Sequence, residues 1–127
     1  YKDDVREMFR MMKEGWVVGL LADQDTNRHD GVVLDFFGKP TNCVPGPAAM
    51  ARSAGIGVIP GCITRKKDGT HKIILHAPVE VPNTKDKRND VRTAEQAVNR
   101  ILEQHIREHP EEWFWLHDRW KSMRKAF

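Results

Sequence analysis

The chain has 127 residues and a formal net charge of +3 at pH 7, and 39% of its residues are hydrophobic while 31% are charged. These values fit one globular domain that buries roughly two thirds of its unfolded surface, and they exclude disordered and fibrous proteins. The slight positive charge permits an anionic membrane, a nucleic acid or an acidic carrier protein as partner and selects none of them.

The two cysteines, Cys43 and Cys62, have no metal-ligand or C-x-x-C spacing, which favours a reduced cytosolic setting. No apolar run approaches the roughly 18 residues typical of a membrane span, and the N-terminus has no signal-peptide pattern. The chain begins without a methionine, which suggests that it is a piece of a longer protein.

The first apolar residues recur at i, i+3, i+4 and i+7, which predicts an amphipathic helix that ends at Gly15. Residues 16–22 are then apolar without alternation and stop at Asp23 and Gln24, as expected for a strand covered on both faces. In open α/β sheets, ligands bind beyond the carboxyl ends of such strands. Asp23 and Gln24 are therefore the first candidates for a binding site.

A polar loop is predicted at 23–31 and a second strand at 32–37, after which residues 38–40 turn the chain out of the sheet. The small residues that follow Pro47 predict a short helix that ends at Gly55. If residues 32–37 form a strand, Phe36 and Phe37 point to opposite faces, so that at most one of them lines a ligand pocket.

Two more strands are predicted at 56–63 and 72–81, joined by a hairpin turn at Asp68-Gly69. Pro60 cannot donate a ladder hydrogen bond, so the first of these strands should bulge or end there. Residues 82–90 look like a solvated linker. A capping box at Thr93 then predicts the start of a long helix that ends before His109-Pro110.

The C-terminal segment interleaves aromatic and basic side chains, and two interpretations remain open. In one, it meets a lipid headgroup boundary through Trp113, Trp115, Arg119, Trp120 and Lys121. In the other, the apolar members form a buried stripe at helical spacing, made of Trp113, Leu116, Trp120, Met123 and Phe127. Binding of nucleic acid is disfavoured, because the aromatic residues are confined to one segment rather than spread over a sheet.

No metal site is expected. Asp23, Asp25 and Asn27 alternate as in a calcium loop, but Arg28 stands where that loop requires glycine. His105 and His109 lie four apart on a helix without an evident third ligand. No glycine-rich phosphate loop and no nucleophile elbow is present, and no cofactor is expected.

Five stretches of sequence stand out: LLADQD at 20–25, GV and DFFGKPT within 31–41, GPAA and AR within 46–52, VIP at 58–60 and PEEWFWLHDRWK at 110–121. In this order, they resemble motifs of the late acyltransferases of lipid A biosynthesis. These are the lauroyl and myristoyl transferases of the lysophospholipid acyltransferase superfamily. The resemblance runs through nearly the whole chain but covers only the C-terminal part of the family's length.

The resemblance implies transfer of a fatty acyl group from acyl carrier protein, or acyl-CoA, to a hydroxyl of a lipid A precursor. The family uses a histidine and a carboxylate in the pattern H-x-x-x-x-D/E, in which the histidine is the general base. None of the six histidines here is followed by Asp or Glu five positions later. We therefore expect no catalytic residue in this chain, and no activity from it alone.

By the same resemblance, Asp23-Gln24 takes the place of the acidic block that follows the catalytic motif, and Pro60 belongs to the final, proline-containing block. The alternative for Asp23 is a turn residue at a strand end. Thr41 and Arg52 are further substrate-binding candidates, since Arg52 could face an anionic phosphopantetheine or lipid phosphate.

The sequence thus predicts an α/β fold, a mixed β-sheet of about four strands flanked by helices, with residues 1–127 forming the C-terminal part of a lipid A acyltransferase domain. The expected location is the cytoplasmic face of the bacterial inner membrane, peripheral or anchored through the missing N-terminal part. The expected partners are acyl carrier protein, a lipid A precursor and the membrane surface, but no nucleic acid. An uncovered sheet edge also predicts a possible dimer. The alternative function is a non-catalytic binding module for an anionic lipid or nucleic acid.

Overall fold

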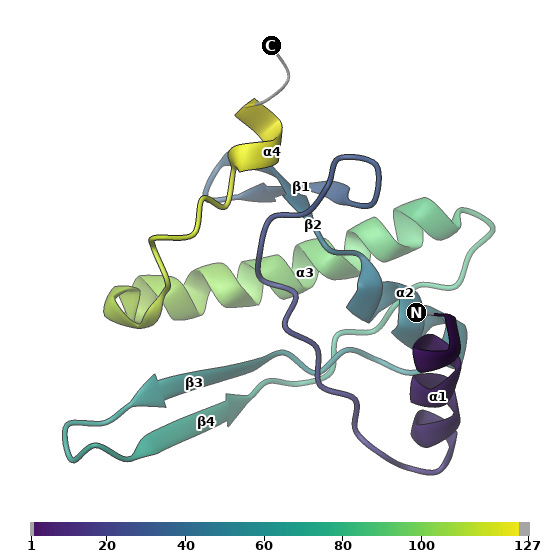
Figure 1. Ribbon diagram of the computed structural model, residues 1–127, viewed down its shortest axis with the longest axis horizontal. Helices are drawn as coiled ribbons and strands as arrows, with labels where there is room; N and C mark the ends of the chain where they lie inside the picture. The colour runs from purple at the N-terminus through teal and green to yellow at the C-terminus, as the bar shows by residue number, and fades with distance from the viewer. Residues whose placement is uncertain (1, 125–127) are drawn as a thin grey trace.

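The computed structural model describes residues 2–124 and combines four α-helices with two separate two-stranded antiparallel sheets (Figure 1). The helices are α1 (Lys2–Lys13), α2 (Gly46–Ala54), α3 (Lys87–Glu108) and α4 (Lys121–Arg124), with a 3-10 turn η1 (Pro110–Glu112). The strands are β1 (Val32–Phe36), β2 (Lys39–Cys43), β3 (Gly61–Arg65) and β4 (His71–Leu75). The predicted α/β class is confirmed. The four strands form two pairs, however, and not one mixed sheet.

Helix α3 crosses the middle of the molecule, with the β1–β2 hairpin on one side of it and the β3–β4 hairpin on the other (Figure 1). The most deeply buried apolar side chains come from β1, α2 and α3, and they include Leu34, Phe36, Ala48, Ala94 and Ile106. The long helix therefore organises the core.

The β1–β2 hairpin corrects the prediction that residues 38–40 turn the chain out of the sheet, because Lys39 and Pro40 belong to β2. Strand β2 returns antiparallel to β1, with Phe36 opposite Lys39. Phe37 and Gly38 form the two-residue connection, and both have positive φ, at 53° and 73°. That combination is the signature of the hairpin turn whose twist matches the strands. A phenylalanine in the first turn position hides the signal from sequence inspection.

Several predicted boundaries are confirmed. Helix α2 ends at Gly55, which adopts the left-handed conformation at φ 68° and whose N–H bonds to the last turn. The β3–β4 hairpin turns at Asp68-Gly69, where Gly69 has φ 85°. The ladder also breaks at Pro60, because Val58 pairs with Val79 in an isolated bridge while β3 begins only at Gly61.

Helix α3 begins at Lys87, six residues before the predicted capping box at Thr93, so the expected linker at 82–90 is partly helical. The true N-cap is Asp86, whose side chain accepts a hydrogen bond from the Asn89 N–H at 3.0 Å. The helix ends at Glu108, before Pro110, as predicted.

Residues 16–22 do not form a strand, which contradicts the prediction. Val17 and Leu21 are 90% and 99% exposed, and residues 17–24 make no backbone hydrogen bond to any other residue in the range 2–124. A strand needs a neighbour to pair its N–H and C=O groups. Within the described part of the chain, each of the four strands pairs inside its own hairpin, and none lies alongside this segment.

Residues 113–120 are irregular, and the short helix α4 follows Trp120. Leu116 is 88% exposed, so the alternative of one buried helical stripe is wrong for the described residues. Phe127, which belonged to that stripe, lies outside them. Trp113 and Trp120 instead pack against Phe36, with ring centroids 6.0 Å and 5.7 Å from its own.

Candidate functional site

A cavity of about 320 Å³ lies between α3, residues 20–23 and the start of β3. Its wall is mainly apolar, with contributions from Leu20, Ala22, Val58, Pro60, Val98 and Leu102. Asp23 is part of the same wall. Two of the predicted substrate-binding residues, Asp23 and Pro60, thus meet at one cavity. Such a cavity, apolar with a few polar groups, is typical of small-molecule binding sites.

Gln24 follows Asp23 in the chain but does not line the cavity, and its side chain is exposed. Phe36 and Phe37 are also absent from the cavity wall. Phe36 is 1% exposed and belongs to the core, whereas the ring of Phe37 lies 4.8 Å from the guanidinium carbon of Arg107.

The loop after Asp23 is fixed by the C-terminal segment. The backbone N–H of Asp25 donates to His117 Nε2 at 2.9 Å, and the Asp25 carboxylate accepts from the Ser122 backbone N–H at 2.8 Å and from Ser122 Oγ at 2.7 Å. Asn42 on β2 holds the next part of the loop, because its Nδ2 donates to the carbonyls of residues 26 and 27. These contacts join three distant stretches of sequence and determine where Asp23 lies.

Thr41 and Arg119 form a buried pair and do not line the cavity. Thr41 is 0% exposed and Arg119 is 1% exposed. The guanidinium donates to Thr41 Oγ1 at 3.0 Å, to the Asn42 carbonyl at 2.6 Å and to Cys43 Sγ at 2.7 Å. Thr41 Oγ1 in turn donates to the Arg119 carbonyl at 2.8 Å. Both side chains therefore attach the C-terminal segment to β2.

Arg52 is engaged in an ion pair on another side of the fold. Its Nε lies 2.9 Å from Asp90 Oδ2, and its Nη2 donates to the Thr84 carbonyl at 2.7 Å. Burial raises the pKa of Asp90, but hydrogen bonds from Thr84 and Arg52 outweigh it and hold the pKa below its ordinary value. Arg52 thereby connects α2 to the start of α3.

Glu95 contributes a buried carboxyl group to the cavity wall and was missed by sequence reasoning. It is 5% exposed, and its Oε1 accepts a hydrogen bond from the Ala48 N–H at 2.8 Å, in the first turn of α2. Burial raises the pKa of Glu95 to about 7, although the Ala48 N–H lowers it. The cavity wall therefore holds a carboxyl group whose pKa lies near neutral pH.

Cys43 is also part of the cavity wall, but its thiol is not an activated nucleophile. Burial raises the pKa of Cys43, against the lowering effects of Arg119 and Asn99. A thiol with a raised pKa stays protonated at neutral pH. No group of three or more metal-ligating side chains is found among residues 2–124.

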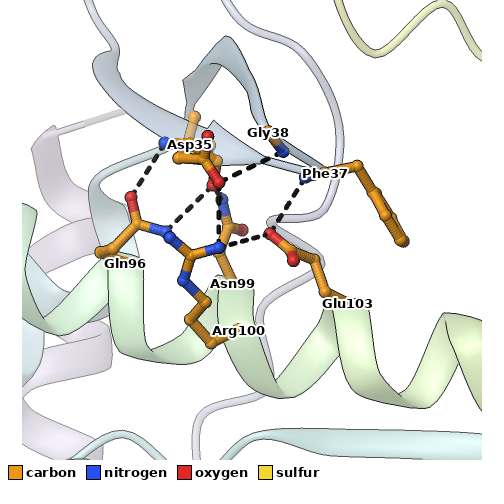
Figure 2. A network of polar contacts seen from close by, with 8 residues as sticks. Asp35, Phe37, Gly38, Gln96, Asn99, Arg100 and Glu103 are labelled. Carbon is orange, nitrogen blue, oxygen red and sulfur yellow. Dashed lines mark hydrogen bonds and ion pairs between the residues drawn. The ribbon is translucent and has the colours of Figure 1, made fainter.

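A polar face of α3 binds the edge of β1, as Figure 2 shows. Gln96 accepts from the Asp35 N–H and donates to the Asp35 carbonyl, while Glu103 Oε1 accepts from the Phe37 N–H at 3.1 Å. Arg100 completes the group through an ion pair with the Asp35 carboxylate at 2.9 Å. Side chains of a helix thus satisfy backbone groups that a further strand would otherwise pair.

The sequence does contain a signal that α3 buries a row of polar side chains. Glu95, Asn99 and Glu103 recur every four residues, and all three are less than 8% exposed. Such spacing puts them on one side of a helix, among the apolar positions. Charged residues at this spacing are usually taken as solvent-facing, which is why sequence reasoning passed over them.

The five residues predicted to contact a membrane lie in different environments. Trp113 is part of the cavity wall, Trp120 packs on Phe36 and Arg119 is interior. Trp115 is 57% exposed, and Lys121 is exposed as well. Among the described helices, none combines the length and the apolar character needed to cross a bilayer.

The cavity thus combines a mainly apolar wall with the carboxylate of Asp23 at the point where a polar loop begins. The chain belongs to the bacterial lipid A biosynthesis acyltransferase family, whose sequence profile matches residues 1–122. The resemblance inferred from the motifs is thereby confirmed.

The chain is 28% identical over 122 residues to a lipid A biosynthesis lauroyltransferase of Escherichia coli (strain K12), which covers 95% of this chain and 39% of that relative. It is 28% identical over 125 residues to a lipid A biosynthesis acyltransferase of Haemophilus influenzae, with the same two coverages. A phosphatidylinositol mannoside acyltransferase of Mycobacterium tuberculosis is 30% identical over 110 residues, which are 86% of this chain and 32% of the relative. The chain spans about two fifths of the length of the first two relatives.

Proposed function

We propose that this chain is the part of an O-acyltransferase that holds the fatty acyl chain and orients the acceptor hydroxyl. The donor is acyl carrier protein, or acyl-CoA, and the acceptor is a hydroxyl of a lipid A precursor. The observation that carries the proposal is the apolar cavity with Asp23 in its wall, in a chain whose relatives are named as acyltransferases. A cavity of this kind shields a hydrocarbon chain from water.

In the proposed reaction, the acceptor oxygen attacks the thioester carbonyl, the carbon–sulfur bond breaks and the carrier thiol leaves. A histidine of the H-x-x-x-x-D/E dyad takes the hydroxyl proton and returns it to the thiolate. No such pair occurs among the 127 residues, so the dyad comes from the rest of a longer protein. Asp23 accepts a hydrogen bond from a hydroxyl of the acceptor and fixes its direction of approach.

The same longer protein accounts for the exposed apolar segment at residues 16–22. Its apolar side chains, and the backbone groups of residues 17–22 that pair with no described residue, fit a neighbouring strand supplied by the part of the family's length that this chain does not cover. Residues 1–127 would then be the C-terminal part of the domain. Without that strand, the segment is free to pair with a second copy, which gives a dimer.

We place the protein at the cytoplasmic face of the bacterial inner membrane, where a lipid acceptor and a soluble acyl carrier can meet. The support is the family and the relatives named for lipid A biosynthesis. Trp115 and Lys121 are the exposed members of the aromatic and basic set and are suited to lipid contact.

A second acceptor has specific support. One relative is named for acylation of phosphatidylinositol mannoside and is as similar to this chain as the lipid A enzymes are. Both acceptors are glycolipid hydroxyls, so the difference concerns the sugar and not the chemistry. Transfer assays with the two acceptors in parallel distinguish them.

Binding of an acyl chain can be tested on the 127 residues alone, because Trp113 lies in the cavity wall. A bromine-labelled dodecanoic acid quenches tryptophan emission only at short range. We expect saturable quenching that is lost in Trp113→Phe and weakened in Val98→Phe, which narrows the cavity. Val33→Phe, on the exposed face of β1, is the matched control and should bind normally. Quenching that survives in Trp113→Phe, or that Val98→Phe leaves unchanged, would refute the proposed acyl site.

A further inference from the structure

We propose that the β3–β4 hairpin is the surface by which this chain docks on an anionic lipid bilayer. Its exposed apolar face enters the headgroup region of the bilayer, and the basic residues at its tip bind lipid phosphates. The inference rests on the membrane-side function proposed above, and it assigns the contact to a part of the fold outside the C-terminal aromatic segment. The hairpin lies below the C-terminal half of α3 in the view of Figure 1, with its turn at the left.

One face of the hairpin is apolar and uncovered. Ile63 and Ile73 are direct cross-strand partners and are 54% and 69% exposed. Leu75, which is 71% exposed, lies on the same face opposite Gly61. Residues i and i+2 of a strand share a face, so these three side chains form one continuous row.

The other face is the packed one. Cys62, Thr64 and Ile74 alternate with the exposed row, and all three are partly buried. Cys62 belongs to the wall of the cavity that α3 also lines, and Gly61 and Ile63 of the exposed face reach the same wall, whereas Ile73 and Leu75 do not. The hairpin therefore carries most of its packed side chains on one face, and on the other face Ile73 and Leu75 are left available for a partner.

The tip carries a cluster of positive charge. Residues 65–72 contain four cationic side chains and one acidic residue, Asp68. The cationic side chains are Arg65, Lys66, Lys67 and Lys72. The Asp68 carboxylate is occupied by the N–H and hydroxyl of Thr70, at 2.9 Å and 2.6 Å. Within residues 2–124, none of the four cations takes part in an ion pair.

A bilayer fits this surface better than a protein strand does. Residues 17–22 have mostly apolar side chains and a backbone that pairs with no residue in the range 2–124, and only a polypeptide can satisfy such a backbone away from water. Strands β3 and β4 already pair with each other, and their outer edges stay at headgroup depth, where water remains. The charge at the tip would find no partner in an apolar protein interface, whereas lipid phosphates complement it.

The contact to Glu112 fixes the orientation of the hairpin. The backbone N–H of Arg65 donates to Glu112 Oε1 at 3.2 Å, which ties the end of β3 to η1. The tip is thereby held at the C-terminal end of α3, and the cavity lies between the hairpin and that helix. Docking through the exposed face would bring the cavity close to the lipid surface.

The test is co-sedimentation of the 127-residue chain with vesicles of phosphatidylcholine, with or without phosphatidylglycerol. We expect binding to the anionic vesicles that weakens with added salt. Each basic residue near an anionic surface contributes about fivefold to binding, so Lys66→Gln with Lys67→Gln should weaken it about 25-fold. The matched control, Lys85→Gln with Lys87→Gln, removes the same charge at the opposite end of α3 and should bind like the parent chain.

The apolar face is tested separately with Ile73→Ser, which exposes no new cavity because Ile73 is a surface residue. It should also lose binding, with an unchanged circular dichroism spectrum. Trp115→Ser tests the C-terminal segment in the same assay. Three results would overturn the proposal. Vesicle binding could be lost only in Trp115→Ser, or it could fall equally in the Lys66/Lys67 variant and in its Lys85/Lys87 control. In the third, the hairpin variants lose self-association and bind vesicles as the parent chain does. Quenching by the brominated acid does not depend on vesicles, so docking and the acyl site can fail independently.

Discussion

The side-chain amide of Gln96 makes two hydrogen bonds to the backbone of one residue, Asp35. It accepts from the Asp35 N–H at 2.9 Å and donates to the Asp35 carbonyl at 3.0 Å (Figure 2). A helix side chain thus copies the pairing that a neighbouring strand makes. The relationship connects α3 to the edge of β1 that does not pair with β2.

Replacing this amide should destabilise the fold. Gln96→Leu leaves the Asp35 N–H without a partner and the Asp35 carbonyl with only the 3.5 Å contact from Asn99 Nδ2, at a cost of about 1 to 3 kcal/mol in the free energy of unfolding. Gln104→Leu, on the exposed side of the same helix, is the control and should change stability by less than about 0.5 kcal/mol. Urea unfolding monitored by circular dichroism measures both. Equal stability of the two variants would contradict the role assigned to Gln96.

Gly31 should not tolerate a side chain. A Cβ at this position would lie 2.1 Å from Asn42 Oδ1, and the Asn42 amide is held by its bonds to the loop carbonyls. Gly31→Ala should therefore cost about 1 to 3 kcal/mol, as overpacking usually does. Gly19→Ala, where nothing lies within 4 Å, serves as the comparison. If Gly31→Ala unfolds at the same urea concentration as Gly19→Ala, the loop is not anchored as described.

Glu95 should make stability fall as the pH rises from about 4.5 to about 7. Its pKa is raised from 4.5 to about 7 in the folded chain, so the folded state binds the proton more tightly than the unfolded one. The contribution is complete below pH 4.5 and is lost as the pH passes 7, with a total of about 3 kcal/mol. Glu95→Gln keeps the Ala48 hydrogen bond but does not titrate. The difference between the two unfolding curves against pH isolates the carboxyl group, and parallel curves would show that Glu95 is not buried.

Arg119 and Lys121 should behave differently, although they lie two residues apart in a basic segment. Arg119→Lys loses hydrogen bonds from a buried guanidinium, each worth about 1.5 to 3 kcal/mol, and should lower stability by at least about 2 kcal/mol. Lys121→Ala is a surface change and should stay within about 0.5 kcal/mol. Thermal unfolding compares them. If Arg119→Lys unfolds at the same temperature as the parent chain, the guanidinium of Arg119 is not buried as described.

Elements with local signals were predictable from the sequence. Gly15, Gly55 and Pro60 each mark a boundary that the structure reproduces, because left-handed glycines and a missing proline N–H act on their own segments. The start of α3 was missed because residues 87–90 are polar. Asp90 nevertheless points inward, where Arg52 from another helix compensates its charge.

Residues 16–22 show the limit of a local pattern. An apolar run predicts a buried strand, but burial and pairing depend on partners elsewhere in the chain, and residues 2–124 do not provide them. The same limit applies to predicting which residues line the cavity. Asp23 and Pro60 could be proposed from their resemblance to family motifs, whereas Glu95 required the packing of α2 on α3 to be known.

We propose that this chain supplies the acyl-holding half of an acyltransferase site and that the half that moves the proton lies outside these 127 residues. The most direct test of this proposal is transfer of a labelled lauroyl group from acyl carrier protein to a lipid A precursor. The assay compares the 127 residues alone with the same residues joined to a family N-terminal part that contains H-x-x-x-x-D/E. We predict activity for the joined protein, a lower kcat for its Asp23→Asn variant and only background for the isolated chain. Transfer by the isolated chain, or an unchanged kcat in the Asp23→Asn variant of the joined protein, would contradict the proposed division of the site.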